Sequence, residues 1–183
     1  MKRSTLILIT LGFAPAALAA SAHPRTDPAR DVTVTYQVRQ GGKTLTQQSW
    51  WLVSRKLQRV NLATVPAYII EDGAAHTATV IDTHAHTAMR YKTHPNTALQ
   101  QASFTRLGHE TVAGKRCTDW KVTPKNPDQG SPQTMCYTED GVLLRTVRGG
   151  KTVLIATTVD YGPVAAGEFA IPAGYKSLDN KSQ

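Results

Sequence analysis

The sequence from Asp31 onward alternates apolar and polar residues in short segments that are separated by tight turns. Residues 32–38 read VTVTYQV, so every second side chain is apolar, and Gly41-Gly42 follows them. The segment 153–161 repeats this period after Gly149-Gly150. A period of two is typical of strands with one buried face, and paired glycines permit the tight reversals of hairpins. The sequence therefore predicts a mostly β chain that folds as an antiparallel meander.

The same pattern places the individual elements. The expected strands are 32–38, 44–53, 57–62, 68–70, 76–81, 87–92, 104–112, 116–122, 134–138, 142–148 and 152–161. One short helix is expected at 97–103, with Pro95 or Asn96 near its start. Residues 169–175 carry apolar side chains together with Pro and Gly, and we expect them to pack back across the sheet as a short edge segment.

An antiparallel meander of this length must close or curl to hide its apolar face. The predicted fold class is therefore a single curved antiparallel sheet, a half-open barrel, with one or two short helices. A chain of 183 residues with 40% hydrophobic and 19% charged residues fits one globular domain. We assign that domain to residues 31–179, with a tail at 180–183.

The N-terminus has the three zones of a secretory signal peptide. Lys2-Arg3 precedes an apolar run from Leu6 to Phe13, and a small-residue region ends at Ala22. Cleavage is expected after Ala19 or Ala22, so residues 1–22 form the signal peptide and 23–30 a flexible lead-in. No other stretch is apolar enough to cross a bilayer. The mature chain is predicted to be a soluble periplasmic protein without a transmembrane segment.

The only two cysteines are Cys117 and Cys136, an even number that favours a disulfide in an exported chain. A turn-rich stretch at 123–132 lies midway between them. If the flanking strands are antiparallel neighbours, Cys117 lies opposite Cys136, within reach of a disulfide bond. No Cys-x-x-Cys motif is present, which argues against a redox or metal-binding pair.

The sequence contains no recognisable catalytic motif. There is no Gly-x-Ser-x-Gly, no phosphate-binding glycine-rich loop and no free thiol once the cysteines are paired. Acidic pairs such as Glu71-Asp72 and Glu139-Asp140 lie beside turn glycines, where acidic residues are common for backbone reasons. We therefore expect neither an enzyme nor a bound cofactor. The formal net charge of +8 suits anionic lipid headgroups or an acidic protein, and nucleic acid is not an expected partner of an exported chain.

Histidines near one turn are the only candidates for metal ligands. In an extended segment, His84 and His86 would share a face with Asp82, and His76 would approach from the facing strand. A structural metal site needs four fixed ligands, and scattered histidines are more often solvated. We therefore predict no metal site and keep His84 and His86 as weak candidates.

Aromatic residues suggest where an apolar ligand would bind. Trp50 and Trp51 are adjacent, so in a strand their side chains point to opposite faces of the sheet. One of them would join other apolar residues in a pocket, while the alternative is ordinary sheet packing. The pocket candidates are Trp50, Trp51, Tyr68, Ile70, Tyr91 and Phe104.

Two segments carry a resemblance to known proteins. Residues 104–120 (FTRLGHETVAGKRCTDW) and 135–145 (MCYTEDGVLLR) resemble a group of small exported bacterial proteins of unknown function. These in turn resemble the outer-membrane lipoprotein-carrier (LolA-like) superfamily, and the resemblance spans about 32–178. It implies a half-open barrel whose concave face receives lipoprotein acyl chains in the carriers. This chain has little helix to form a lid, and Arg106 and Arg145 are the nearest matches to the carriers' gating arginine.

Two functions remain open on these grounds. The first is a soluble periplasmic binding or carrier module that holds an acyl chain, a lipoprotein or another apolar ligand in the concave face. The second is an envelope protein-interaction or stress-sensing module that binds a partner protein without a ligand. Fold alone does not choose between them.

Overall fold

The computed structural model describes residues 23–94 and 97–179. Twelve strands form one sheet. The strands are β1 (Val32–Gln40), β2 (Lys43–Leu52), β3 (Leu57–Asn61), β4 (Ala67–Asp72), β5 (Thr77–Asp82), β6 (Thr87–Lys92), β7 (Ser103–Val112), β8 (Lys115–Thr123), β9 (Gln133–Tyr137), β10 (Leu143–Arg148), β11 (Lys151–Tyr161) and β12 (Lys176–Asp179). Helical turns are short: η1 (Val53–Arg55), α1 (Thr97–Gln100), η2 (Pro127–Gln129) and η3 (Ala166–Phe169).

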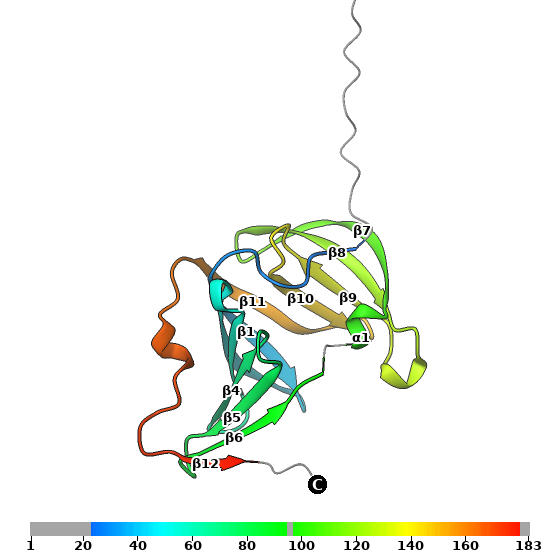
Figure 1. Ribbon diagram of the computed structural model, residues 1–183. Helices are drawn as coiled ribbons and strands as arrows, with labels where there is room; N and C mark the ends of the chain where they lie inside the picture. Colours follow the sequence, from blue (N-terminus) through cyan, green and yellow to red (C-terminus); the bar gives the residue numbers. More distant parts are fainter. Residues whose placement is uncertain (1–22, 95–96, 180–183) are drawn as a thin grey trace, which may run out of the picture.

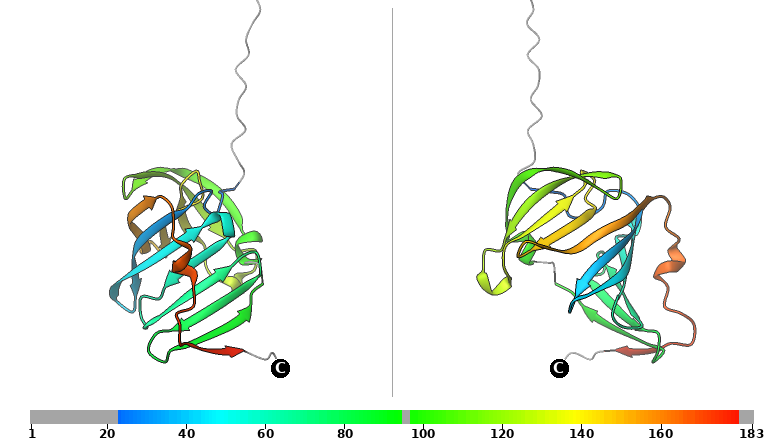
Figure 2. Two further views of the ribbon diagram at one scale, coloured as in Figure 1. Left: turned by 60° about the vertical axis from the view of Figure 1, so that its left-hand side comes forward. Right: turned by 180° about the vertical axis from the view of Figure 1, so that it is seen from behind.

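The order of strands across the sheet is β12-β6-β5-β4-β3-β2-β1-β11-β10-β9-β8-β7. The pairing of β1 with β11 joins two meanders, β1–β6 on one side and β7–β11 on the other. Every neighbouring pair is antiparallel except β12 with β6, which is parallel. The sheet bends between its two halves, so that β7–β10 lie over one side of β1–β6 (Figures 1 and 2). The predicted curved, mostly β fold is confirmed.

Irregular pairing accompanies the bend. Register shifts occur where β11 pairs with β1 and with β10, where β10 pairs with β9, and where β7 pairs with β8. Pairing from β1 through β6 shows no shift in register. A bulge adds one residue to one strand and increases the local twist and bend. The bulged half therefore curls, while the β1–β6 half keeps a regular pleat with well-defined faces.

The main core lies where the two halves meet. Val32 and Val34 of β1 are fully buried and pack with Leu144 of β10. Tyr36 of β1 donates a hydrogen bond from its hydroxyl to the Leu143 carbonyl, at 2.9 Å. A second cluster surrounds Trp120 in the β7–β10 half, and a third lies against the C-terminal segment. The alternation seen in 32–38 thus directs one face of β1 into the core.

Several predicted boundaries differ from the structure. α1 ends at Gln100 rather than at 103, because Ser103 already pairs with Thr123 in the β7–β8 ladder. Its expected start at Pro95 or Asn96 lies outside the described residues. β5 begins at Thr77 because His76 has a left-handed backbone, with φ of 52°.

In the C-terminal segment, residues 169–175 pack back against the sheet as expected, but they lie on its face and do not form the expected edge segment. Residues 163–175, which include η3, run along the side of β1–β6 that points away from β7–β10 (Figure 2). Phe169 and Tyr175 pack there against Tyr68, Ile70, Ile81 and Ala88. The edge strand is β12, which follows this segment. β12 was not predicted from the sequence, because a strand that pairs in parallel does not follow its partner through a hairpin turn.

The disulfide between Cys117 and Cys136 is present, with a Cα–Cα distance of 5.5 Å. The register is not the one predicted, because Cys136 lies opposite Asp119 and not opposite Cys117. The cysteines are therefore diagonal neighbours on adjacent strands, which a disulfide also spans. Both are buried in the main core.

Residues 23–30 lie against the domain. Pro28 is buried, the Ala29 amide donates to the Asp140 carbonyl at 2.8 Å, and Arg30 forms an ion pair with Asp140. Gly141 makes this approach possible, because a Cβ at that position would overlap the Asp27 carbonyl. The predicted signal peptide, 1–22, and the tail, 180–183, lie outside the described residues. Within the described residues, none of the helices has the length and hydropathy needed to span a bilayer.

Replacing both cysteines by alanine should lower the free energy of unfolding by roughly 3 kcal/mol, because the disulfide closes a loop across a sequence separation of 19. Urea unfolding of the oxidised wild type and of the double variant measures this difference. Equal midpoints and slopes would show that the disulfide contributes no stability.

Gly141→Ala should release residues 23–30 from the domain, because the new methyl group cannot coexist with the Asp27 carbonyl. Gly114→Ala is the matched control, since Gly114 also has positive φ but has no atom within 4 Å of the added carbon. Trypsin should cut after Arg25 and Arg30 faster in Gly141→Ala than in Gly114→Ala. Equal cleavage rates would contradict this role for Gly141.

Candidate functional site

The structure does not bring the six predicted pocket residues together. Through cross-strand pairing, Trp50 shares a face of the sheet with Ile70, and Tyr68 lies on that face too. This is the face covered by the C-terminal segment, and we call it the outer face. Trp51 and Tyr91 lie on the opposite, inner face, which is turned toward β7–β10 (Figure 2). Phe104 belongs to the separate cluster around Trp120.

The outer-face aromatics are occupied by a protein cation. The Arg59 guanidinium lies 3.9 Å from the centre of the Tyr68 ring and 5.0 Å from that of Trp50. Its Nη1 also pairs with a Glu168 carboxylate oxygen at 3.0 Å and donates to the Glu168 carbonyl. Arg59 therefore fastens η3 to the sheet, and these aromatic rings serve packing rather than a ligand pocket.

The inner face carries a row of apolar side chains that crosses five strands. Cross-strand pairs run from β3 to β12 without a break, and the row, which we call the apolar strip, consists of Val60, Ile69, Val80, Met89 and Leu178. Its members on β3–β5 are half-buried, while Met89 is 42% exposed and Leu178 is 43% exposed. Tyr91 lies two residues beyond Met89 on the same face and is also exposed. The strip is thus an apolar surface that opens toward one edge of the sheet.

A hollow of about 470 Å³ adjoins this strip at Trp51. It is lined by residues of the lead-in, by residues of β2–β5 and their turns, and by Thr93, which follows β6. The lining is Asp27, Pro28, Trp51, Val53, Lys56, Leu57, Gln58, Glu71, Asp72, Gly73, Thr77 and Thr93. The row of paired residues that includes Trp51, Gln58 and Glu71 lies two residues along the strands from the strip, so this part of the hollow lies beside the strip on the inner face.

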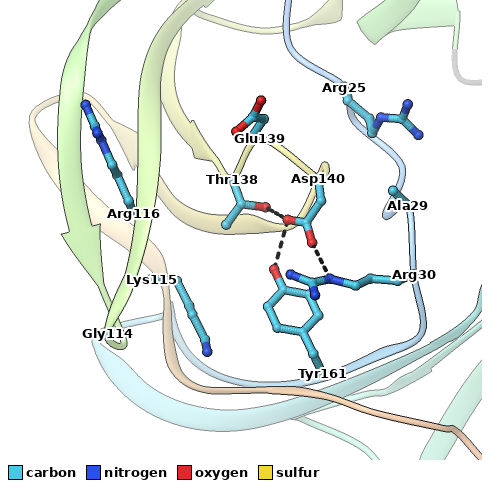
Figure 3. Close-up of a pocket in the computed structure, with 10 residues that line it drawn as sticks. All are labelled: Arg25, Ala29, Arg30, Gly114, Lys115, Arg116, Thr138, Glu139, Asp140 and Tyr161. Carbon is cyan, nitrogen blue, oxygen red and sulfur yellow. Dashed lines mark hydrogen bonds and ion pairs between the residues drawn. The ribbon is translucent and has the colours of Figure 1, made fainter.

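A second hollow, of about 490 Å³, is more basic (Figure 3). Asp140 is the centre of its hydrogen bonds, since its carboxylate accepts from Arg30, Tyr161 and Thr138 at 2.9, 2.9 and 2.6 Å. Burial raises the pKa of Asp140, but these hydrogen bonds outweigh burial, and the pKa lies below its ordinary value. The Arg30 guanidinium also stacks 3.8 Å from the centre of the Tyr161 ring. The network ties residues 23–30 to the β9–β10 turn.

The two arginines singled out by the resemblance have different surroundings. Arg145 is half-buried and pairs with Glu110 at 2.6 Å and with Asp119 at 3.2 Å. Burial raises the pKa of Glu110 and outweighs the opposite effect of Arg145. Arg106 is exposed and lies 3.2 Å from a ring nitrogen of His109. Arg145 thus belongs to a structural ion-pair cluster, and neither arginine faces the hollow at Trp51.

His84 and His86, the candidate metal ligands, belong to a type of turn that occurs twice in the sheet. Residues 72–77 and 82–87 share the pattern Asp-x-x-Ala-His-Thr. In each, the aspartate Oδ1 accepts from the amides two and three residues later, and the histidine has φ of 52°. In the described part of the chain, neither His84 nor His86 lies in a cluster of side chains that could hold a metal ion. Asp82 is a turn residue, and hydrogen bonds from Ala85 and His84 keep its pKa low.

No family model matches the sequence, and no curated protein matches it. Solved structures do match. An uncharacterised conserved protein from Thermus thermophilus is 10% identical over 82% of this chain and 91% of that chain, with a TM-score of 0.62. A chain of the Pseudomonas aeruginosa MucA/MucB complex is 15% identical over 80% of this chain and 57% of that chain, with a TM-score of 0.55.

A domain from Vibrio parahaemolyticus, described as a putative outer membrane lipoprotein-sorting protein domain, is 10% identical over 79% of this chain and 91% of that chain. Its TM-score of 0.34 is too low to support an argument. At these identities, the first two likenesses show the fold alone. They agree with the curved antiparallel sheet that the sequence resemblance implied.

Sequence reasoning missed the apolar strip, although a signal for it was present. The repeated Asp-x-x-Ala-His-Thr turn fixes which residues pair on either side of it. Asp72 pairs with Thr77 across the first turn, so three residues further along each strand Ile69 pairs with Val80. In the same way, the second turn pairs Val80 with Met89. Asp27 and Leu178 had no such signal, because their positions depend on contacts between distant parts of the chain.

Asp140→Asn should destabilise the protein by about 1–2 kcal/mol at pH 7, because its carboxylate accepts three hydrogen bonds, one of them from a guanidinium. A carboxylate with a lowered folded-state pKa adds stability above its unfolded pKa of about 3.9 and loses that contribution as the pH falls through the folded value. The difference between wild type and variant should therefore shrink below about pH 4. Urea unfolding across this range tests the prediction, and a difference independent of pH would contradict it.

Proposed function

We propose that this chain is an exported binding or carrier module that holds an acyl chain or a similar apolar ligand on the inner face of its sheet. The proposal is supported by one observation above all, the apolar strip. Its side chains on β3–β5 are only half-buried, and those of Met89 and Leu178 are exposed. An apolar surface that is continuous and left open typically marks a binding site.

The shape of the strip favours an elongated ligand. Its members follow one another across neighbouring strands at about 5 Å intervals, so the strip is long and narrow. An extended hydrocarbon chain matches such a row better than a compact ring system does. This interpretation replaces the predicted six-residue pocket, of which only Trp51 and Tyr91 lie on the inner face. No reaction is part of the proposal, and the half-buried strip itself offers only apolar side chains.

A partner protein is the second candidate, and a different surface favours it. β7 forms one edge of the sheet and pairs on only one side within the described residues. Leu107 projects from this edge at a register shift and is 57% exposed. The fold is shared with a chain of the MucA/MucB complex, which assembles from two proteins. Under this alternative, Leu107 rather than Met89 would be the residue that matters.

Met89→Glu and Leu107→Glu form a matched pair that tests the carrier proposal, because each places a carboxylate at an exposed apolar position but only Met89 lies on the strip. The mature protein is titrated with a fluorescent dodecanoyl probe. Met89→Glu should weaken binding by about tenfold or more, since a charge beside a buried hydrocarbon costs at least about 1.4 kcal/mol. Leu107→Glu should bind like the wild type. No binding by the wild type, or equal affinity in all three proteins, would refute the carrier proposal.

A further inference from the structure

The hollow at Trp51 is acidic, although the protein is basic. Its lining contains the carboxylates of Asp27, Glu71 and Asp72 against the single amine of Lys56. The whole chain carries a formal net charge of +8. We propose that this hollow binds the cationic end group, an ammonium, of an amphiphile whose apolar chain lies along the strip. The inference rests on the proposed function and adds the chemical class of the ligand.

Two of the three carboxylates are available to a ligand. Asp72 is engaged, because its Oδ1 accepts from the amides of Ala74 and Ala75 at 2.9 and 2.8 Å. Asp27 and Glu71 make neither an ion pair nor a side-chain hydrogen bond across residues 23–94 and 97–179. They line the same hollow but come from distant parts of the chain, one from the lead-in and one from the end of β4. A cation between them would interact with both.

The third element is the Trp51 indole, which lies on the same face as Glu71 through their common partner Gln58. Trp51 is only half-buried, and no arginine or lysine lies over its ring in the described part of the chain, whereas Arg59 covers Trp50. Aromatic faces attract cations, and ammonium groups are typically held by an aromatic ring together with carboxylates. Trp51 packs against the main core and also lines the hollow, where its indole offers an aromatic surface to a cation.

The position of the hollow fits an amphiphile. The row that contains Trp51 and Glu71 lies two residues along the strands from the row of the strip, which is roughly 7 Å. A cationic group in the hollow would thus place its alkyl chain at Val60 and Ile69, the half-buried beginning of the strip. The chain would then run toward Met89 at the open edge.

Two probes with twelve-carbon chains and opposite charges test the inference, namely dodecyltrimethylammonium and dodecanoate, each used below its micellar concentration. Calorimetric titration of the mature, disulfide-bonded protein should show that the ammonium probe binds about tenfold tighter or more. The overall positive charge favours the opposite order, so this preference can only arise locally. The double variant Asp27→Asn, Glu71→Gln should lose the preference, while Glu139→Gln, at the basic hollow, should keep it.

The outcomes separate this inference from the function on which it rests. Equal affinities, or tighter binding of dodecanoate, would overturn the cationic end group and leave an apolar carrier. Binding of neither probe would overturn both proposals. A preference for ammonium that survives in the double variant would overturn the assignment of Asp27 and Glu71.

Discussion

The pairing of β1 with β11 is the interaction on which the rest of the structure depends. Without it, the chain would be two separate meanders, each with an exposed apolar face. The pairing buries Val32 and Val34 together with Leu144, and it brings Tyr36 within 2.9 Å of a carbonyl in β10. Closing so long a loop is entropically costly, and burial of this central cluster offsets the cost. The disulfide and the main core lie in the same cluster, so the sheet is fixed most firmly where it bends.

The bend determines which surfaces remain for binding. Register shifts concentrate in β1 and β7–β11, and they curl that half over the inner face of β1–β6. The outer face is covered by the C-terminal segment, which Arg59 and Glu168 hold in place. On the inner face, the members of the strip on β3–β5 stay half-buried, and its outermost residues, Met89 and Leu178, are exposed. This asymmetry is consistent with the proposed carrier function, in which one face stabilises the fold and the other accepts a ligand.

Local sequence patterns predicted most of the strands and their order along the chain, because hairpins leave a period of two with glycine or aspartate at the turns. They also predicted the disulfide, although not its diagonal register. The pocket was predicted less well, since it depends on which faces of distant strands meet. Trp50 and Tyr68 were reasonable ligand candidates from the sequence, but Arg59 and η3, which are more than 100 residues apart in the chain, occupy them. The parallel strand β12 and the fit of Asp27 against Gly141 also depend on distant contacts.

The most direct test of a ligand on the inner face uses the methionines. The chain has 3 methionines, and with Met1 in the predicted signal peptide, Met89 on the strip and Met135 in the cluster around Trp120 remain. Each ε-methyl group, labelled with carbon-13, gives its own NMR signal. When the mature protein is titrated with a twelve-carbon amphiphile, the Met89 signal should move in proportion to binding while the Met135 signal stays in place. Movement of Met135 alone, or of neither signal at saturating ligand, would contradict the account.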